Sequence, residues 1–414
     1  MTEREEGNEE ATRVVVLGAG YGGCAAVQSL EGEREDRDID IVWVSATDHH
    51  LVLHEAHRCL RTPSVAETIS IPVEEVKSPA TRFVEATVTG LDVDERRVEL
   101  DDHDDLAYDY AVVGLGSQTA FFGIDGLEDH ALTLKSLDDA LTITDRLRDA
   151  AREATRDDPA QVVVGGGGLT GIQTAGEIAA WREDRDAPVE VHLVERSGEV
   201  FPGHDHEFQG AIQNRLEAHD VHVDTGTAVS SVEDDTIRFE ERDPFEYDVL
   251  VWAGGVTGQA ALDDADVDKE HNRLYTGATL ETSDDRVFAI GDSALVHQDA
   301  DEGPLTEEAI WDSIADEDLD DVPPPTAEAA WEEGQHIGEN VVRAIDGRDR
   351  RHWAYMNKGT LVSVGDDAVA HDVVGVPLNT FGGPGARVIK KAISARWIAT
   401  VGSWRRAARA WPNM

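Results

Sequence analysis

The stretch TRVVVLGAGYGG at residues 12–23 decides the fold of this chain. An apolar run of buried-strand type leads into Gly18, Gly20 and Gly23, which are spaced as GxGxxG, and a helix-forming segment follows. Glycines at this spacing let the backbone approach a pyrophosphate, whose charge then meets the exposed N–H groups of the helix. Strand, glycine turn and helix together predict a dinucleotide-binding unit.

The same device recurs 148 residues further along the chain. The stretch QVVVGGGGLTG at residues 161–171 again joins an apolar run to a helical segment, through Gly166, Gly168 and Gly171. One such motif alone is weak evidence, because glycine turns also serve as plain structural turns. Two copies in the same context predict an α/β protein with two Rossmann-like dinucleotide-binding domains.

The residue after the second strand of each unit indicates which dinucleotide is bound. Glu195 stands 24 residues after Gly171, where a carboxylate accepts hydrogen bonds from ribose hydroxyls and repels a 2′-phosphate. NADH is therefore favoured over NADPH in the second unit. The alternative is an exposed glutamate without a role in an acid-rich protein. Ser45 occupies the matching position of the first unit, so the fingerprint is incomplete there.

The charge of the chain is extreme and unevenly distributed. A net charge of −49 over 414 residues opposes a general affinity for nucleic acid, because phosphates are repelled. So acidic and lysine-poor a composition resembles the proteins of salt-in halophilic archaea, in which concentrated cation screens the self-repulsion. Residues 373–414 differ, since they carry seven basic residues and no acidic one.

This basic segment also carries a regular apolar pattern. Trp397, Trp404 and Trp411 are seven residues apart, and Ile389 and Ile393 extend the same helical face. A basic helix with interfacial tryptophans predicts that residues 386–414 lie in a membrane surface. The alternative is that the apolar stripe packs on the body of the protein or on a second copy of the chain, as in a homodimer.

Other features limit the location and the chemistry. The amino terminus lacks a signal sequence, and no apolar run approaches the roughly 20 residues that a membrane span needs. Cys24 and Cys59 form no CxxC pair, which suits a reducing cytoplasm, and we expect Cys24 to be a small buried apolar residue. The string of histidines at residues 49–57 has no familiar ligand spacing, so no metal site is predicted.

These motifs give the chain a family resemblance. The two glycine turns are joined by further segments at residues 110–124, 134–137, 175–177, 251–256, 288–292 and 358–359. With them the chain resembles the flavoproteins that have two dinucleotide-binding domains, and among these the type II NADH:quinone oxidoreductases. The resemblance runs from about residue 12 to 400.

The resemblance implies FAD in the first unit and NADH in the second. The residues that it assigns to FAD are Gly18, Gly20, Tyr21, Gly23, Ser45, Val88, Gly116, Gly291 and Asp292. Among these, Asp292 would bond the ribitol and Val88 would hold the adenine through its backbone. The residues that it assigns to NADH are Gly166, Gly168, Gly171, Glu195 and Gly255.

The implied reaction is hydride transfer from NADH to FAD, followed by reduction of a membrane quinone of menaquinone type. Lys358, Gln173 and Glu328 are the expected catalytic residues, with the Lys358 cation stabilising the anionic reduced flavin. Gln173 stands where the family has glutamate, whereas Glu328 and Glu332 stand where it has glutamine. These departures leave the quinone and the electrostatics of its site open.

The predicted organisation has four parts. They are a disordered acidic tail at 1–11, a discontinuous FAD-binding domain at 12–119 and 283–345, an NADH-binding domain at 120–282, and a quinone and membrane-surface segment at 346–414. An acidic loop is expected at 312–322. The enzyme would be peripheral, on the cytoplasmic face of the membrane, and would not pump protons. The alternatives are a reductase for a soluble acceptor such as a ferredoxin-like protein, and a flavin or NAD sensor without turnover.

Overall fold

The computed structural model describes residues 11–34, 37–298 and 322–411. The chain divides into two compact units, each built from three segments. Unit 1 combines Met1–His50, Ile71–Gln118 and Thr257–Met356, and unit 2 combines Leu51–Ser70, Thr119–Val256 and Asn357–Met414. The expected acidic loop at 312–322 lies outside the described residues apart from Val322, as does the acidic tail apart from Ala11.

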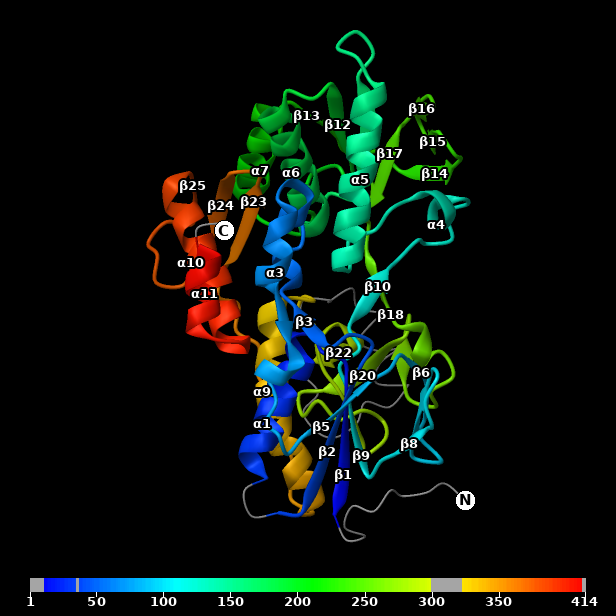
Figure 1. Ribbon diagram of the computed structural model, residues 1–414, viewed down its shortest axis with the longest axis vertical. Helices are drawn as coiled ribbons and strands as arrows, with labels where there is room; N and C mark the ends of the chain where they lie inside the picture. Colours follow the sequence, from blue (N-terminus) through cyan, green and yellow to red (C-terminus); the bar gives the residue numbers. More distant parts are fainter. Residues whose placement is uncertain (1–10, 35–36, 299–321, 412–414) are drawn as a thin grey trace. The chain divides into compact units, whose positions relative to one another are not determined.

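Unit 1 is built on a five-stranded parallel sheet with the order β21-β9-β1-β2-β5 (Figure 1). Its strands are β1 (Thr12–Leu17), β2 (Ile39–Ser45), β5 (Arg82–Glu85), β9 (Tyr110–Val113) and β21 (Val287–Ala289). β1 lies in the middle of the sheet and pairs with β2 on one side and with β9 on the other. The strand order therefore reverses at β1, which is where sheets of this kind bind ligands beyond the carboxyl ends of their strands.

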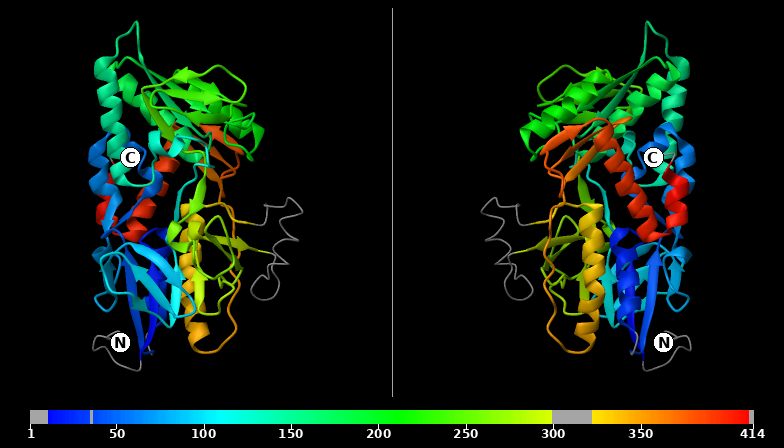
Figure 2. Two further views of the ribbon diagram at one scale, coloured as in Figure 1. Left: turned by 90° about the vertical axis from the view of Figure 1, so that its right-hand side faces the viewer. Right: turned by 90° about the vertical axis from the view of Figure 1, so that its left-hand side faces the viewer.

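Two helices pack side by side in unit 1, α1 (Tyr21–Glu33) and α9 (Ala327–Ile345) (Figure 2). Gly334 and Gly338 of α9 allow this approach, because a β-carbon at either would collide with α1 at Gly22 or Ser29. Thr326 caps α9 by accepting a hydrogen bond from Ala329 N at 3.2 Å. The helix therefore begins directly after its capping residue.

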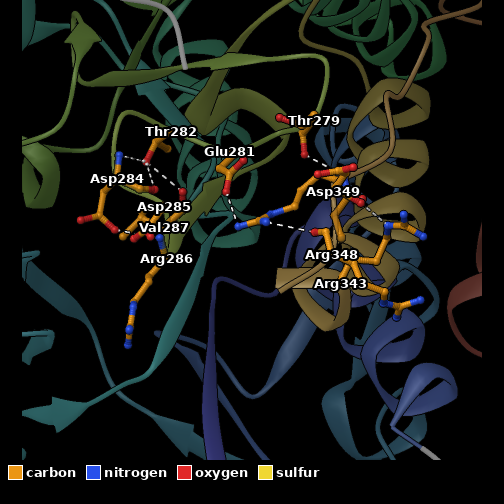
Figure 3. Close-up of polar contacts among 12 residues, drawn as sticks. Thr279, Glu281, Thr282, Asp284, Asp285, Arg286, Val287, Arg343, Arg348 and Asp349 are labelled. Carbon is orange, nitrogen blue, oxygen red and sulfur yellow. Dashed lines mark hydrogen bonds and ion pairs between the residues drawn. The ribbon is translucent and has the colours of Figure 1, made fainter. Parts of the chain in front are cut away.

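The remaining strands of unit 1 form two small sheets. One contains β6 (Val88–Asp92), β7 (Arg97–Leu100) and β8 (Leu106–Ala107), and the other contains β19 (Lys269–Glu270), β20 (Arg273–Gly277) and β22 (Ala294–His297). Polar contacts hold the end of α9 to the segment before β21 (Figure 3). Arg350 Nη2 pairs with Glu281 Oε1 at 2.7 Å, and Asn340 Nδ2 donates to Thr279 O at 2.8 Å.

Unit 2 contains a second parallel sheet, with the order β13-β12-β11-β17. Its strands are β11 (Ala160–Gly165), β12 (Val189–Val194), β13 (Val221–Asp224) and β17 (Val249–Trp252). The helices that pack on this sheet are α5 (Leu137–Glu153), α6 (Leu169–Arg185) and α7 (His206–Ala218). Two parallel sheets with helices confirm the α/β prediction.

The rest of unit 2 covers this sheet and its helices. A small sheet of β14 (Val229–Val232), β15 (Thr236–Phe239) and β16 (Phe245–Glu246) packs with Val163 and Leu250 in one apolar cluster. The short helices are α2 (Arg58–Arg61), α3 (Ala66–Ile69) and α4 (Leu127–His130). β3 (His49–Leu51), β4 (Ser70–Pro72), β10 (Ser117–Thr119) and β18 (Val256–Gly258) lie where the chain passes between the units.

The carboxyl-terminal residues belong to unit 2. They form β23 (Thr360–Val364), β24 (Asp367–His371), β25 (Thr380–Gly382), α10 (Pro384–Val401) and α11 (Trp404–Ala410). β23 packs on α6, and β24 packs on α7 and α10. These contacts join residues 357–414 to the unit that holds the second glycine turn, so the units divide the chain differently from the boundaries predicted at 282 and 345.

Candidate functional site

The glycine turn of unit 1 leaves room for a ligand at one position. Gly20 is the N-cap of α1, and a β-carbon placed on it would meet no heavy atom within 4 Å. No side chain caps this helix, and its first turn has no acidic residue. The N-terminus of α1 therefore has open space at Gly20, and the N–H groups of a helix end fit the pyrophosphate of a dinucleotide.

The other two glycines of this turn have a packing role. Gly18 has φ = +100°, and a β-carbon there would collide with the carbonyl of Gly114. A β-carbon on Gly23 would collide with the carbonyl of Gly18. Gly18 and Gly23 thus keep β1, α1 and the loop after β9 in close contact, while no neighbouring atom requires glycine at Gly20.

Asp292 lies at the same edge of the sheet, in the turn after β21. Its carboxylate accepts a hydrogen bond from Ser117 Oγ at 2.6 Å, and its carbonyl accepts one from Arg273 Nε at 2.8 Å. The hydroxyl of Ser293 donates to Gly116 O at 3.2 Å. The loops after β9 and β21 are therefore fastened together, and Asp292 stands at the carboxyl edge where the turn of β1 also lies.

Three further predicted FAD residues lie around this edge. Tyr21 begins α1 and contacts the ring of His50 edge to face at 4.7 Å, while His50 Nδ1 bonds Ala19 O at 2.8 Å. Ser45 ends β2 and is buried, and its Oγ accepts a hydrogen bond from Thr47 N at 3.3 Å. Val88 begins β6 and is buried. The ligand contacts assigned to these residues stay predictions.

Glu333 is a deeply buried acid of unit 1 that no motif in the sequence indicated. Its carboxylate accepts a hydrogen bond from Gly291 N at 2.5 Å, although only 3% of the residue is exposed. Burial raises the pKa of Glu333 to about 8, and repulsion by Asp292 adds to the rise. With Arg273 and the proline run at 323–325 it lines a cavity of about 10 Å³, room for one water. The one sequence signal for a buried Glu333 was the pair of glycines that follow it in α9, Gly334 and Gly338, because glycines in a helix interior indicate close packing.

The glycine turn of unit 2 repeats this division of roles. Gly166 has φ = +102°, and a β-carbon on Gly171 would collide with the carbonyl of Gly166. Gly168 is the N-cap of α6, without a side-chain cap, and a β-carbon on it would meet nothing within 4 Å. The N-terminus of α6 therefore also faces open space at the one glycine that packing does not require.

Glu195 reaches the same turn from the end of β12. Its Oε2 accepts a hydrogen bond from Gly167 N at 2.6 Å, and its Oε1 accepts one from Ser197 N at 2.7 Å. Each carboxylate oxygen retains a lone pair for a further donor. The carboxylate is thus fixed beside the glycine turn, where a ribose hydroxyl can bond it and a 2′-phosphate would be repelled.

Gly255 lies after β17 in unit 2. It has φ = +158°, and a β-carbon on it would come within 2.7 Å of the Phe122 ring, whose own residue is 66% exposed. Trp252 Nε1 donates to Ala120 O at 2.9 Å, which fixes the strand end before this turn. Because Gly255 has no side chain, its backbone lies close to the exposed ring of Phe122, at the carboxyl end of β17.

The three predicted catalytic residues lie in different surroundings. Gln173 is buried in α6 of unit 2, where its Nε2 donates to Ser363 Oγ at 3.0 Å and His57 Nε2 lies 3.2 Å from the same hydroxyl. Lys358 is half-buried before β23 in unit 2, and its carbonyl accepts a hydrogen bond from Val374 N at 3.2 Å. Glu328 is half-buried in the first turn of α9 in unit 1.

A buried charge network lies elsewhere in unit 2. Glu55 is 1% exposed, and its carboxylate pairs with Arg58 Nε at 2.5 Å and Lys390 Nζ at 3.6 Å and accepts a hydrogen bond from Ser394 Oγ at 2.6 Å. Burial alone would raise the pKa of Glu55, but Lys390 and Arg58 together hold it well below its usual range. The network fastens α10 to the segment at 51–70.

For a second buried carboxylate of unit 2, Glu177, burial has a larger effect on the pKa than the neighbouring cations have. Glu177 is also 1% exposed, and Arg61 Nε lies 3.1 Å from its Oε2. Burial raises the pKa of Glu177 to about 7, because the lowering by Arg61 and Arg58 does not offset the loss of solvent.

The prediction of one continuous apolar face at the carboxyl end is wrong. The helix stops at Val401, and Ser403 caps a new helix by accepting a hydrogen bond from Arg406 N at 3.3 Å. Trp397 is buried within unit 2, whereas Trp404 is 75% exposed. Because the helix is interrupted at 402–403, Trp397 and Trp404 lie on two different helices. Their seven-residue spacing therefore does not place them on one helical face. No helix among the described residues has the length and apolarity to span a bilayer.

Three comparisons place the chain among known proteins. The family described as pyridine nucleotide-disulphide oxidoreductase matches residues 12–334. A type II NADH:quinone oxidoreductase of Staphylococcus haemolyticus is 26% identical over 414 residues, which cover 95% of this chain and 97% of the relative. One of Staphylococcus aureus is 26% identical over 413 residues, with the same shares of the two chains.

Solved structures share the fold over nearly the whole chain. NDH2 from Plasmodium falciparum in complex with NADH has a TM-score of 0.80 at 16% identity, covering 97% of this chain and 98% of that one. The sulfide:quinone oxidoreductase from Aquifex aeolicus has a TM-score of 0.76 at 17% identity, covering 94% and 91%.

Proposed function

The chain belongs to the pyridine nucleotide-disulphide oxidoreductase family, and on that premise we propose that it is a type II NADH:quinone oxidoreductase. It oxidises NADH with a bound FAD and passes the electrons to a membrane quinone. The observation that carries the proposal is the pair of glycine turns with open helix N-termini, one of which has the Glu195 carboxylate fixed beside it. The whole-length similarity to relatives of that name supports it.

The cysteines favour this activity over the disulfide chemistry of the wider family. Cys24 and Cys59 are both fully buried, and burial raises the pKa of the Cys24 thiol above its usual range and that of Cys59 to about 12. A thiolate, not a thiol, is the redox nucleophile. These residues therefore serve packing, which agrees with the expected role of Cys24.

The residues of unit 1 hold the flavin. The N-terminus of α1 at Gly20 receives the pyrophosphate, Asp292 bonds the ribitol, and Val88 bonds the adenine through its backbone. When bound, the flavin supplies the acceptor for hydride and the donor of electrons to the quinone. Tyr21, Ser45, Gly116 and Gly291 shape this binding surface at the edge of the parallel sheet.

The residues of unit 2 hold NADH. Glu195 accepts hydrogen bonds from the ribose, the N-terminus of α6 at Gly168 receives the pyrophosphate, and Gly255 admits the ligand beside Phe122. Gln173 carries no charge and donates to Ser363. It therefore orients groups through hydrogen bonds and does not take up a proton. Lys358 would supply a positive charge to the bound flavin ring, and Glu328 would face the quinone.

We propose that the carboxyl-terminal part of unit 2 binds a membrane surface from the cytoplasmic side. Support comes from exposed apolar side chains of α10 and α11 and the residue after them, Val388, Trp404 and Trp411, which are 57%, 75% and 43% exposed. Basic residues accompany them, and 373–414 contains no acid. We also propose that the electron acceptor is a quinone of menaquinone type. The acidic composition suits a salt-rich habitat, and the chain would act as a homodimer.

Donor and acceptor profiling of the full chain at high salt tests the function. The purified protein should be yellow, NADH should bleach it faster than NADPH, and a short-chain quinone should restore the colour. Protein that binds no flavin would sink the proposal. Turnover with a ferredoxin-like protein but not with quinone would establish the soluble-acceptor alternative, and bleaching without turnover would establish the sensor.

A further inference from the structure

One face of the parallel sheet in unit 2 gathers three side chains of the types that ligate metals. Glu190 and His192 belong to β12, and His222 belongs to β13. His192 and His222 are register partners on these parallel strands, and Glu190 stands two residues before His192, hence on the same face. One candidate ligand atom from each residue lies within 4.8 Å of the others.

A neighbouring amide fixes the proton on one of the imidazoles. Gln161 Nε2 donates to Pro159 O at 2.9 Å and to Glu190 Oε2 at 3.2 Å, so its amide oxygen is the atom that faces His192 Nε2 at 2.9 Å. An amide oxygen only accepts, so His192 Nε2 carries the hydrogen and Nδ1 carries the lone pair. Ligating histidines typically donate their other ring N–H in this way.

Two rings pack against the imidazole of His192. Its ring lies 4.7 Å from the ring of Phe245 and is stacked on His222 at 4.8 Å, with 23° between the ring planes. Asp224, which ends β13, pairs with Arg242 at 3.1 Å.

Because the His192 and His222 rings are stacked, one of them must rotate before both can bind the same cation. A cation lies in the plane of each imidazole that ligates it, and two nearly parallel rings cannot share one such cation. His222 is exposed, so its side chain can rotate about its torsions while the strand stays in place. Gln161 holds His192 and Glu190, and these two form the fixed part of the set.

We propose that Glu190, His192 and His222 form a binding site for a divalent transition-metal cation. Two imidazoles and one carboxylate, with a water completing a tetrahedron, suit Zn²⁺, whereas Mg²⁺ prefers oxygen ligands alone. A bound cation joins the edge strand β13 to β12 and stabilises this sheet by mass action. The site departs from the expectation of no metal, because that expectation considered only histidines close in sequence.

The site is tested by isothermal titration calorimetry, in which Zn²⁺ alone is added to the chelator-treated full chain in molar KCl. We expect one Zn²⁺ per chain and no comparable binding of Mg²⁺. His222→Gln and Glu190→Gln should each weaken Zn²⁺ binding at least about 10-fold, and Gln161→Leu, which removes only the orienting amide, about 10- to 100-fold. His103→Gln removes an exposed histidine of unit 1 and should leave the affinity unchanged.

His222 is exposed, so its replacement should leave the fold intact, and NADH oxidation by the same preparation checks this. Absence of Zn²⁺ binding by the wild-type chain overturns the proposal. So does a His222→Gln variant that binds Zn²⁺ as tightly as the wild type. X-ray absorption at the zinc edge provides an independent readout, because two imidazole ligands give a signature that a purely acidic surface site lacks.

Discussion

The carboxylate of Glu195 accepts a hydrogen bond from the backbone N–H of Gly167, 2.6 Å from Oε2, within the glycine turn that opens α6. This bond, with the one from Ser197, fixes a negative charge beside the open N-terminus of the helix. The electrostatics of the turn therefore work in two directions. In the proposed function, the helix end would attract the pyrophosphate, while the carboxylate would accept hydrogen bonds from ribose hydroxyls and repel an added phosphate.

Glu195→Gln should reduce the preference for NADH. The amide keeps the shape and one acceptor but removes the charge, and a hydrogen bond to a charged group contributes about 1.5–3 kcal/mol. We expect KM for NADH to rise roughly 10-fold and the NADH-to-NADPH ratio of kcat/KM to fall. Glu217→Gln, an exposed change on α7, is the control. An unchanged ratio would remove Glu195 from nucleotide recognition.

Gly20→Ala should abolish flavin binding without unfolding the protein. A β-carbon fits at Gly20 in the structure, so the expected clash is with the pyrophosphate alone. Gly32→Ala is the matched control, because a β-carbon there also meets nothing within 4 Å, and alanine in a helix interior adds about 0.5–1 kcal/mol of stability. Flavin absorbance per chain measures the outcome. Full flavin content in Gly20→Ala would contradict the assignment.

Lys390→Met should destabilise unit 2 by about 3 kcal/mol, because it removes one partner of a buried ion pair. Glu55 would keep only Arg58 and Ser394 in a site that is 1% exposed. Adding Glu55→Gln should recover part of the loss. Lys391→Met, on the same helix, should change the free energy of unfolding by less than about 0.5 kcal/mol. Urea denaturation at constant salt measures all four proteins, and equal effects of the two lysine variants would refute the buried pair.

Glu333→Gln should flatten the pH dependence of stability between about pH 5 and 8. Because burial raises the pKa of Glu333 to about 8 in the folded state, the native protein holds a proton there that the unfolded chain releases above about pH 4.3. The wild type therefore loses stability as pH rises through this window, and this component ends above the folded pKa. The free energy of unfolding at several pH values checks the slope. Identical slopes in both proteins would show that Glu333 is charged when buried.

Trp404→Ser should weaken binding to vesicles of anionic lipid about 10-fold or more. Burying a large apolar side chain contributes about 1.5–3 kcal/mol, and Trp404 is 75% exposed. NADH oxidation with a short-chain quinone should stay unchanged. Met356→Ser, which removes a side chain of unit 1 that is 62% exposed, is the control. Deleting residues 386–414 is a poorer test, because α10 contributes buried residues such as Trp397 to the core.

Local patterns were enough to predict the elements that form the two dinucleotide turns. Apolar runs before Gly18 and Gly166 predicted β1 and β11, and Asp205 and Thr326 are of the residue types that cap helix starts, as they do in the structure. Each of these depends on neighbours a few residues away. At Gly402 and Ser403 a local stop signal was present too, but the seven-residue tryptophan spacing favoured one continuous helix. The structure shows that the stop prevails.

The sequence by itself determined that two nucleotide-binding turns exist, because strand, glycine turn and helix N-terminus are contiguous in the chain. It also determined that an acid follows β12. Only the tertiary structure decided which distant groups meet: Glu333 with Gly291, Glu55 with Lys390, and Glu190 with His222. Such pairs depend on strand register and helix packing, which place residues far apart in the chain within a few ångströms. No spacing rule in the sequence specifies those distances.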